Sequence, residues 1–413
     1  MTVPENDALK LEMYTDEDIV DYTHRVNAEA WRGLLSPEEY IERERVLAST
    51  PLSKKHRDLT VREKFPAGYD WVGLKYFVLK DTRLPNTSKT SQIVSSCETL
   101  NSLGYCIYPE GDPREDKEGK EQGSRIQYCL NVCIGGVFTA KRYRGRGYAG
   151  AMIDLLNKFY ENIRDTAESS SLLKNLVMTL YSEVRDYYER VGYISLHVPL
   201  HYIREPQFDN FVQQYCDKGA ESGEPLGFDN YKDLVKLQDE QVKQDLLDCH
   251  RREPQAYVFT VRPDFDKYQW FQHRDVFIME KLGRSTTGHP SFGYTLQDKS
   301  HIIWHHHWSE NTLIILKVYI PKEIKDQATR EKKLGSLLFQ AIKEAQRAKL
   351  EALEFWDEEI RPDKLPKLNS VLRSVCDETD LYATNGSLSA IKPPKGIAAD
   401  SIIWINNAKA SWF

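Results

Sequence analysis

The chain has 413 residues, of which 40% are hydrophobic and 11% aromatic, so it holds enough material for two globular domains and is not a single small module. Its 56 lysine and arginine residues stand against 62 aspartate and glutamate residues, which leaves a formal net charge of −6. This balance excludes a bulk basic field for holding nucleic acid or an anionic membrane, and we expect no such partner.

The N-terminus and the cysteines indicate an intracellular protein. Residues 1–14 lack the basic stretch and apolar core of a secretory signal. The longest aliphatic run, Leu313 to Leu316, is much shorter than the ~20 residues that cross a bilayer. Seven cysteines form an odd set, which favours reduced thiols. We therefore expect a soluble, cytoplasmic protein without a membrane partner, and the sequence leaves its oligomeric state open.

The N-terminal half has the pattern of a mixed sheet with helices on its faces. Ser36-Pro37 is a typical helix start and predicts a helix from Glu38 to Leu47. Apolar spacing predicts an amphipathic helix from Gly147 to Ile163. Strands are expected at Leu74–Leu79, Gln92–Leu100, Tyr128–Thr139 and Leu176–Leu180. The order of strand, turn, helix and strand implies the α/β class.

Two stretches that are poor in hydrophobic residues divide the chain. Residues 109–124 are rich in charge, glycine and proline, which predicts a solvated loop within the first domain. Residues 217–230 have a similar composition and separate halves of domain size. We therefore predict one domain at residues 1–216 and a second at 217–413.

The C-terminal half repeats the order of elements. Strands are expected at Val276–Leu282, His301–Trp308 and Leu313–Ile320, then a helix at about Arg330–Lys349 and a strand at Leu350–Trp356.

The turn that precedes the Gly147–Ile163 helix carries the clearest chemical signal. Gly145 and Gly147 allow unusual backbone angles and close approach of a ligand, while the first N–H groups of the helix face outward. Arg142, Arg144 and Arg146 can add charge-assisted contacts to a phosphate. The alternative is a glycine-capped turn with solvated arginines.

The spacing Arg142-x-x-Gly145-x-Gly147 resembles the R/Q-x-x-G-x-G/A signature of the GCN5-related N-acetyltransferase family, abbreviated GNAT. Asp186 to Tyr193, about 40 residues downstream, is similar to a second segment of that family. The resemblance implies the GNAT fold and acetyl-coenzyme A as co-substrate, without a metal. It implies that the co-substrate is held by Val137, Phe138, Thr139, Arg142, Tyr143, Arg144, Gly145, Arg146, Gly147, Tyr148 and Ala149.

The pair Gly135-Gly136 interrupts an alternating strand just before this turn. Two glycines inside a strand predict a bulge or splay that frees backbone groups from the ladder. In GNAT enzymes the corresponding strand leaves its neighbour and holds the pantetheine arm. The alternative is a bulge that only bends the sheet.

Acetyl transfer to an amine requires removal of the amine's proton and a proton for the leaving thiolate. Tyr188 aligns with the family's tyrosine, so we expect it to be the general acid, with a core tyrosine as the alternative. The strand before the turn contains no acid, which departs from the family pattern. Glu98 and Glu183 are candidates for the base, and each could equally be an ordinary solvated or structural acid.

The second domain resembles a degenerate copy of the first. Arg330 to Gly335 corresponds to the phosphate turn, but Lys333 replaces the middle glycine, so we expect no coenzyme there. His305 and His307 are on one face of a strand without a nearby ligand partner in the sequence, which favours packing or a pH-sensitive wall over a metal site. The apolar C-terminus is expected to dock, and its carboxylate could reach a site.

A narrower resemblance indicates which amine accepts the acetyl group. Trp31 to Glu44, with Ser95–Thr99 and Leu180–Val184, is similar to the fungal lysine N6-acetyltransferase group, which acetylates free L-lysine in lysine catabolism. A protein-lysine or polyamine acetyltransferase is the competing enzyme. A non-catalytic acetyl-coenzyme A sensor is the alternative from another class.

Overall fold

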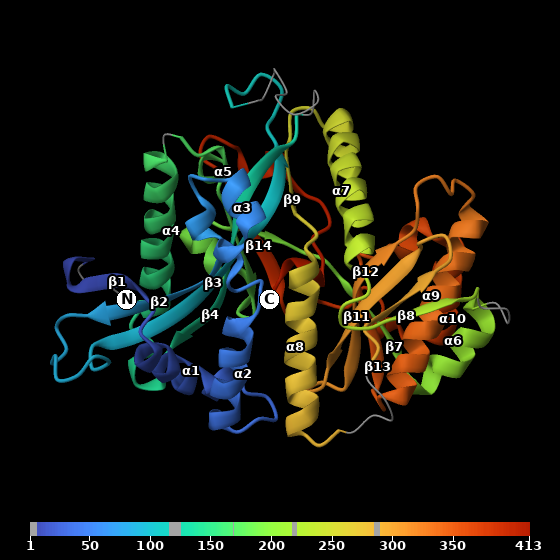
Figure 1. Cartoon of the computed structure of the whole chain (residues 1–413), viewed down its shortest axis with the longest axis horizontal. Coiled ribbons are helices and arrows are strands. Elements are labelled where there is room, and N and C mark those ends of the chain that lie inside the picture. The colour runs from blue at the N-terminus through green and yellow to red at the C-terminus, as the bar shows by residue number, and fades with distance from the viewer. Residues whose placement is uncertain (1–5, 115–124, 168, 217–220, 285–289) are drawn as a thin grey trace.

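Two mixed sheets with helices on their faces make up the molecule (Figure 1). The structure is a computed structural model that describes residues 6–114, 125–167, 169–216, 221–284 and 290–413. Most of the loop expected at 109–124 and part of the linker expected at 217–230 therefore lie outside the described residues. Within the described ranges, no helix has both the length and the apolarity that crossing a membrane requires.

The first sheet carries the glycine turn. Its strand order is β1-β2-β3-β4-β5-β14-β6, with β9 paired to the end of β3 and β15 to β9. β4 and β5 run parallel because helix α4 connects them. The strands are β1 (Leu9–Tyr14), β2 (Gly73–Asp81), β3 (Ile93–Ile107), β4 (Gln127–Thr139), β5 (Val177–Ser182), β6 (Ile194–Leu196), β9 (Tyr257–Val261), β14 (Leu388–Lys392) and β15 (Ile402–Trp404).

Different helices cover the two faces of this sheet. Helix α4 (Tyr148–Thr166) packs on one face, where the Tyr160 hydroxyl lies 2.7 Å from the Thr99 hydroxyl of β3. Helices α1 (Glu17–Trp31), α2 (Pro37–Ser49) and α8 (Phe265–Lys281) lie on the other face. There Ser96 of β3 donates a hydrogen bond to Asn27 of α1. We call these the α4 face and the α1 face.

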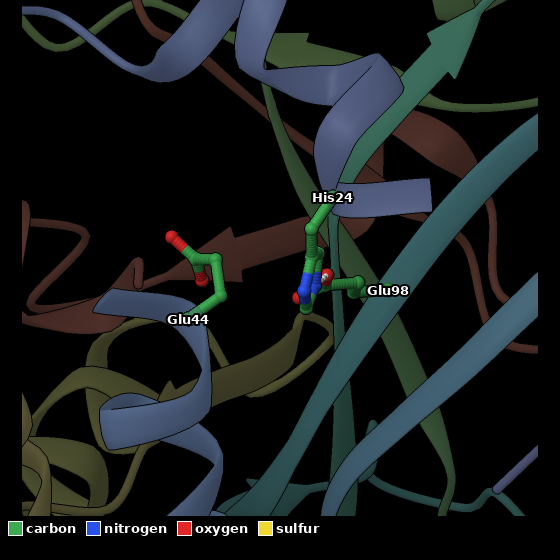
Figure 2. A group of neighbouring side chains, drawn as sticks. All are labelled: His24, Glu44 and Glu98. Atoms are coloured by element: carbon green, nitrogen blue, oxygen red, sulfur yellow. Dashed lines mark hydrogen bonds and ion pairs between the residues drawn. The ribbon is translucent and has the colours of Figure 1, made fainter. Parts of the chain in front are cut away.

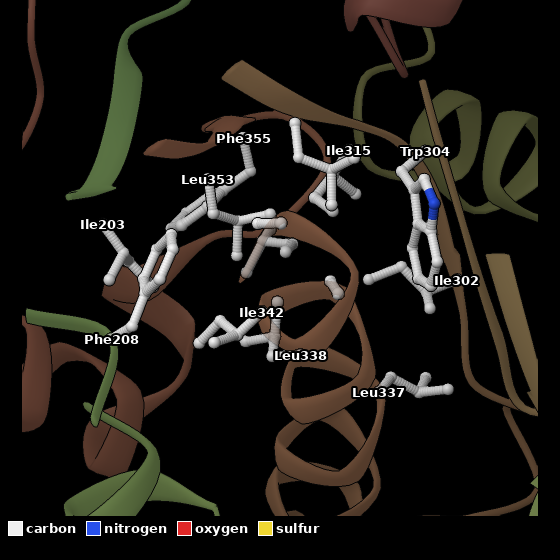
Figure 3. Close-up of a cluster of buried hydrophobic side chains, with 14 of the residues drawn as sticks. Ile203, Phe208, Ile302, Trp304, Ile315, Leu337, Leu338, Ile342, Leu353 and Phe355 are labelled. Carbon is white, nitrogen blue, oxygen red and sulfur yellow. The ribbon is translucent and has the colours of Figure 1, made fainter. Parts of the chain in front are cut away.

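The second sheet repeats the central arrangement of the first. Its order is β7-β13-β12-β11-β10-β8, and helix α9 (Gln327–Arg347) connects the parallel strands β12 and β13. Leu337, Leu338 and Ile342 of α9 are fully buried against the sheet (Figure 3). The strands are β7 (Leu200–Arg204), β8 (Gly223–Leu226), β10 (Gly293–Leu296), β11 (His301–His307), β12 (Thr312–Tyr319) and β13 (Ala352–Trp356).

The mixed α/β class and the repeated GNAT-like order are confirmed. In each sheet an antiparallel pair is followed by a helix and a parallel strand: β3, β4, α4, β5 in the first and β11, β12, α9, β13 in the second. The remaining helices are α3 (Leu59–Lys64), α5 (Ser171–Lys174), α6 (Phe208–Tyr215), α7 (Lys232–Arg252) and α10 (Pro366–Val375).

The two halves exchange strands. β7, from the N-terminal half, pairs with β13 in the second sheet. β14, from the C-terminal half, lies between β5 and β6 in the first sheet. The division at residues 216 and 217 therefore stays a prediction about folding units, because each sheet contains chain from both sides of it.

Most predicted elements of the first half are confirmed. The predicted Glu38 helix is α2, and Ser36 and Glu39 form a reciprocal capping box at its start. The predicted Gly147 helix is α4, with Gly147 as its N-cap. The four predicted strands fall within β2, β3, β4 and β5.

Three expectations for the second half are wrong. Val276 to Leu282 is not a strand, because it forms the end of α8, which Asp264 caps. A short apolar run cannot distinguish the two structures. Arg330 to Gly335 is not a turn but part of helix α9, whose first amides are capped by Asp326. Gly223 to Leu226, expected in a linker, forms edge strand β8, where Pro225 is tolerated.

The C-terminal segment, residues 405–413, lies between the two halves and is docked as predicted (Figure 1). The buried Lys267 of α8 donates a hydrogen bond from Nζ to the Ser411 carbonyl at 2.9 Å. The Trp412 ring stacks on Tyr181 of β5 with 5.4 Å between centroids. Beside Lys267, a small cavity of about 30 Å³ is lined by Val242 of α7, Tyr268 of α8 and Ala410 of the segment.

The last side chain, Phe413, fixes how closely the segment approaches β4. A Cβ atom added to Gly135 would lie 2.6 Å from Cζ of Phe413, so no larger residue fits there without movement. We expect Gly135→Ala to destabilise the protein by about 1–3 kcal/mol in urea unfolding. The double variant with Phe413→Ala should lose less than the sum of the two single variants, because the clash is then absent.

Gly150→Ala is the matched control. Its Cβ atom would meet only the Tyr187 hydroxyl at 3.6 Å, an ordinary contact, in the first turn of α4. We expect this variant to be neutral or slightly stabilising. Equal losses from the two alanine substitutions would contradict the role of Phe413.

Candidate active site

Strands β4 and β5 separate at their carboxyl ends. Their parallel pairing runs from Asn131 and Val177 to Ile134 and Leu180, although β4 continues to Thr139 and β5 to Ser182. Beyond Ile134, β4 stays paired only with β3, and β5 stays paired with β14. The predicted splay is therefore present, and backbone groups that face the gap are free to bind a ligand.

A bulge at the glycine pair accompanies this separation. Glu98 of β3 is opposite Gly135 and Ser96 is opposite Phe138, so the register shifts between them. Gly136 has a φ of 58°, which a residue with a side chain rarely adopts. The bulge redirects the end of β4 away from β5.

The turn after β4 suits a phosphate group. Gly145 and Gly147 have φ angles of 76° and 81°, and a Cβ added to either would meet no heavy atom of the described chain within 4 Å. Gly147 caps α4 without a side chain, so the first amides of the helix stay available. This open, exposed cradle at a helix N-terminus fits the pyrophosphate of acetyl-coenzyme A.

The arginines of the turn are exposed and held over aromatic rings. Arg142 and Arg146 both lie over Tyr143, at 4.8 and 5.8 Å from the ring centroid. Arg144 lies over Phe138 at 4.9 Å and donates a hydrogen bond to the Thr139 carbonyl at 3.1 Å. Their charges can therefore reach a ligand at the turn.

The other residues predicted to contact the co-substrate differ in which of their groups are accessible to it. The Tyr148 hydroxyl donates to Asp81 at 2.6 Å and is turned into the core, so only its backbone amide could serve a ligand. Ala149 is in the first turn of α4. Val137, Phe138 and Thr139 form the free end of β4.

Glu98 is at the bulge on the α1 face. Its Oε1 atom lies 2.7 Å from Nε2 of His24, which projects from α1 and is 1% exposed, and 14% of the Glu98 side chain is exposed. Burial opposes the charged imidazole, but the Glu98 carboxylate outweighs it and raises the pKa of His24. The pair can therefore hold a proton beside the gap above pH 6.5.

Glu44 of α2 completes a group whose ligand atoms lie within 4.8 Å of one another (Figure 2). These distances would admit a cation. However, Nε and Nη2 of Arg43 both donate to Oε1 of Glu44. Arg43 holds the pKa of Glu44 below its usual value against the effect of burial. One carboxylate is already neutralised, which favours a proton-handling cluster over a metal site.

Tyr188 is on the opposite face of the sheet. It lies in the short helix Arg185–Val191, is 8% exposed and packs with Tyr187 and Tyr193 beside α4. Burial raises its pKa, so the hydroxyl keeps its proton at neutral pH. Within the described residues the hydroxyl has no hydrogen-bond partner, which leaves its proton available.

The second candidate base, Glu183, follows β5 and is exposed. Its Oε2 atom accepts a hydrogen bond from Nε1 of Trp31 at 3.4 Å, and the Trp31 ring contacts Phe138 at 5.6 Å between centroids. Trp31 thus contacts both separated strand ends, Glu183 after β5 and Phe138 at the end of β4. Glu98, which is more enclosed and beside the bulge, is the better placed base.

Sequence reasoning missed His24, Glu44 and Arg43. His24 and Glu98 are 74 residues apart in the chain, so only the fold reveals their contact. A signal existed nevertheless, because Thr23, His24 and Asn27 place polar groups on the buried side of α1 beside Ile19 and Ala28. Polar residues on the buried side of a helix require partners.

Comparisons with known proteins agree with this geometry. A family model described as the LYC1 GNAT-like C-terminal domain matches residues 212–413. An uncharacterized protein of Saccharomyces cerevisiae is 47% identical over 415 residues, covering 100% of both chains. A lysine acetyltransferase of Yarrowia lipolytica is 24% identical over 352 residues, covering 76% of each.

The chain belongs to the GNAT superfamily. Among solved structures, a tandem GNAT protein from the clavulanic acid biosynthesis pathway is similar at a TM-score of 0.43 and 10% identity, covering 93% of this chain and 98% of that one. A GCN5-related N-acetyltransferase of Kribbella flavida is similar at 0.44 and 14%, covering 93% and 71%. The activity of this GNAT protein is accordingly that of an acetyltransferase of the GNAT type.

The raised pKa of His24 makes the stability of this GNAT protein depend on pH. The His24–Glu98 pair contributes fully below the unfolded histidine pKa, near 6.5, and its contribution is lost as pH rises through the higher folded pKa. Tyr40, Glu44 and Tyr76 surround the ring. We expect His24→Gln to lower the free energy of unfolding by about 1.5–3 kcal/mol at pH 6 and by less at pH 9.

Urea titrations of both proteins at the two pH values measure this difference. His250→Gln is a control for general histidine effects, since that ring lies in α7 beside Arg125, away from the gap. A loss that is the same at both pH values would contradict a charged His24.

Proposed function

We propose that the chain transfers the acetyl group of acetyl-coenzyme A to the side-chain amine of free L-lysine, by direct attack when both substrates are bound. The observation that carries this proposal is the open end of β4 and β5, with Glu98 on one face of the sheet and Tyr188 on the other. The lysine acceptor is supported by the likeness to the Yarrowia lipolytica enzyme. A role in lysine catabolism and a cytoplasmic location stay predictions.

The co-substrate would be held by the end of β4 and by the turn. Backbone groups on the gap side of Val137 to Thr139 suit the pantetheine arm, although the Phe138 and Thr139 carbonyls already accept hydrogen bonds from Ser95 and Arg144. The amides after Gly147 suit the pyrophosphate. Arg142, Arg144 and Arg146 add charge. Acetyl-coenzyme A, when bound, supplies an acetyl group already activated as a thioester.

The two faces divide the proton chemistry. On the α1 face, Glu98 accepts a proton from the acceptor's ammonium, and the hydrogen bond from His24 holds the carboxylate toward the gap. On the α4 face, Tyr188 keeps a proton that it can give to the leaving group. Because the sheet is open only at the gap, the two substrates would meet there from opposite sides.

The second half supports acceptor binding and not a second coenzyme. Asp326 already caps the N-terminus of α9, and Lys333 pairs with Glu221 at 2.9 Å and Asp298 at 2.8 Å. Neither the amides nor the lysine is therefore free for a phosphate.

Coenzyme binding depends on the left-handed backbone at Gly147. We expect Gly147→Val to raise the Kd for acetyl-coenzyme A at least 10-fold, because a β-branched residue strains at a φ of 81° and its side chain would enter the cradle. Isothermal titration calorimetry measures the affinity, and Gly150→Ala is the control. A Kd that stays within about twofold of the native value would rule out this turn as the binding site.

Release of thiol with different acceptors tests the reaction. We expect release with free L-lysine to exceed that with a lysine peptide or spermidine. Glu98→Gln and Tyr188→Phe should each lower kcat by about 10²–10⁴-fold, the usual contribution of a general base or acid. Glu38→Gln is the matched control, since that exposed acid pairs with Arg25.

Each other outcome assigns a different function. Preference for the peptide or for spermidine would make the chain a protein or polyamine acetyltransferase. Binding of acetyl-coenzyme A without release toward any amine would make it a sensor. If Glu98→Gln kept full activity, Glu98 would not be the base, and Glu183 would be the remaining candidate.

A further inference from the structure

Two cations on the α1 face, Arg274 and Lys409, form no ion pair with any residue that the structure describes. Arg274 of α8 is half-buried, and among the described residues its guanidinium makes neither a hydrogen bond nor an ion pair. Lys409 of the C-terminal segment is also half-buried, and its ammonium contacts only the Trp412 ring within the same ranges, at 3.7 Å. Half-buried cations are normally paired, so donors left open at a domain junction indicate an anionic ligand.

Both cations are connected to the gap through aromatic rings. Arg274 lies over Trp270 at 5.2 Å, the Trp270 ring contacts Phe413 at 5.9 Å, and Phe413 rests against Gly135 of β4. Lys409 lies over Trp412, which stacks on Tyr181 of β5. These ring contacts link Arg274 to β4 and Lys409 to β5, the two strands that separate.

The charges also act on each other. Burial lowers the pKa of Lys409 to about 7, and the charge of Arg274 adds to this effect. Burial lowers the pKa of Arg274 to about 10. Glu354, Glu310 and Glu183 act on Lys409 in the opposite direction, but none of them forms an ion pair with it. An anion placed between the two cations would relieve their mutual repulsion.

A buried imidazole is a further unused polar group on this side of the second sheet. His305 of β11 is fully buried and its Nε2 atom has no hydrogen-bond partner, while its Nδ1 atom lies 3.4 Å from Asp275 of α8. Burial lowers the pKa of His305, and the charges of Arg274 and Lys409 add to this effect. The predicted role of His305 as part of a pocket wall is consistent with this position.

We infer that Arg274 and Lys409 bind the carboxylate of the acceptor, so that this site selects an amino acid over a diamine. The inference rests on the proposed function, since it concerns the acceptor of that reaction. Glu98 then receives the amine, and the two cations receive the carboxylate. A polyamine lacks the anion and would meet the positive charge of Arg274 with nothing to neutralise it.

The test compares L-lysine with cadaverine, which is lysine without its carboxylate. We expect Arg274→Gln to raise the KM for L-lysine by roughly 10–100-fold with little change in kcat, since it removes a charged contact made equally throughout the reaction. The KM for cadaverine should not rise. Lys409→Met should act in the same direction, and Arg274→Lys should restore part of the loss.

Arg284→Gln is the matched control. Arg284 also lies over a tryptophan ring, Trp308 at 5.4 Å, but it follows the end of α8 and is outside the site. Thermal unfolding and acetyl-coenzyme A affinity should be unchanged in Arg274→Gln, because an unpaired half-buried charge adds no stability. A purely structural arginine would lower the Tm and leave the preference for lysine intact.

The outcomes separate this inference from the proposed function. Absence of thiol release from the native protein with every amine would overturn the proposed function. Native activity on cadaverine equal to that on L-lysine, or an unchanged KM for L-lysine in both Arg274→Gln and Lys409→Met, would overturn the carboxylate site alone.

Discussion

Backbone hydrogen bonds between β4 and β5 end at Ile134 and Leu180, although both strands continue. The other parts of the candidate site are arranged around this opening. The bulge at Gly136 turns β4 aside, the cradle at Gly145 and Gly147 follows directly, and the C-terminal segment closes the α1 face with Phe413 against Gly135. A fully paired sheet would leave no backbone group of these strand ends for a ligand.

Charge is distributed unevenly around the opening. The glycine turn carries exposed arginines, which suits a phosphorylated co-substrate. The α1 face carries the proton-handling pair of His24 and Glu98 and the unpaired cations of α8 and the C-terminal segment. The net charge of −6 conceals this pattern, because it sums charges of opposite sign that lie in separate places on the molecule.

The sequence predicted the parts of the site that are local in the chain. The spacing of Arg142, Gly145 and Gly147 and the pair Gly135-Gly136 depend on backbone angles, which glycine reveals directly. Contacts between distant segments are not predictable from the sequence, because His24 meets Glu98, and Trp270 meets the docked Phe413, only once α1 and α8 pack on the same face. The apolar end of α8 resembles a strand because a short apolar run fits either structure, and only the full length from the Asp264 cap distinguishes the helix.

Exchange of strands between the halves affects how the protein is made. The first sheet needs β14, whose first residue, Leu388, follows Ser182 of β5 by 206 positions. At a synthesis rate of about 5–20 residues per second, roughly 10–40 seconds pass between the synthesis of β5 and that of β14, its neighbour in the sheet. During that interval the hydrogen-bonding edge of a buried strand is uncovered, so nascent chains would be at risk of pairing with one another. This topology therefore places the cost of a late partner strand on β5, at the centre of the candidate site.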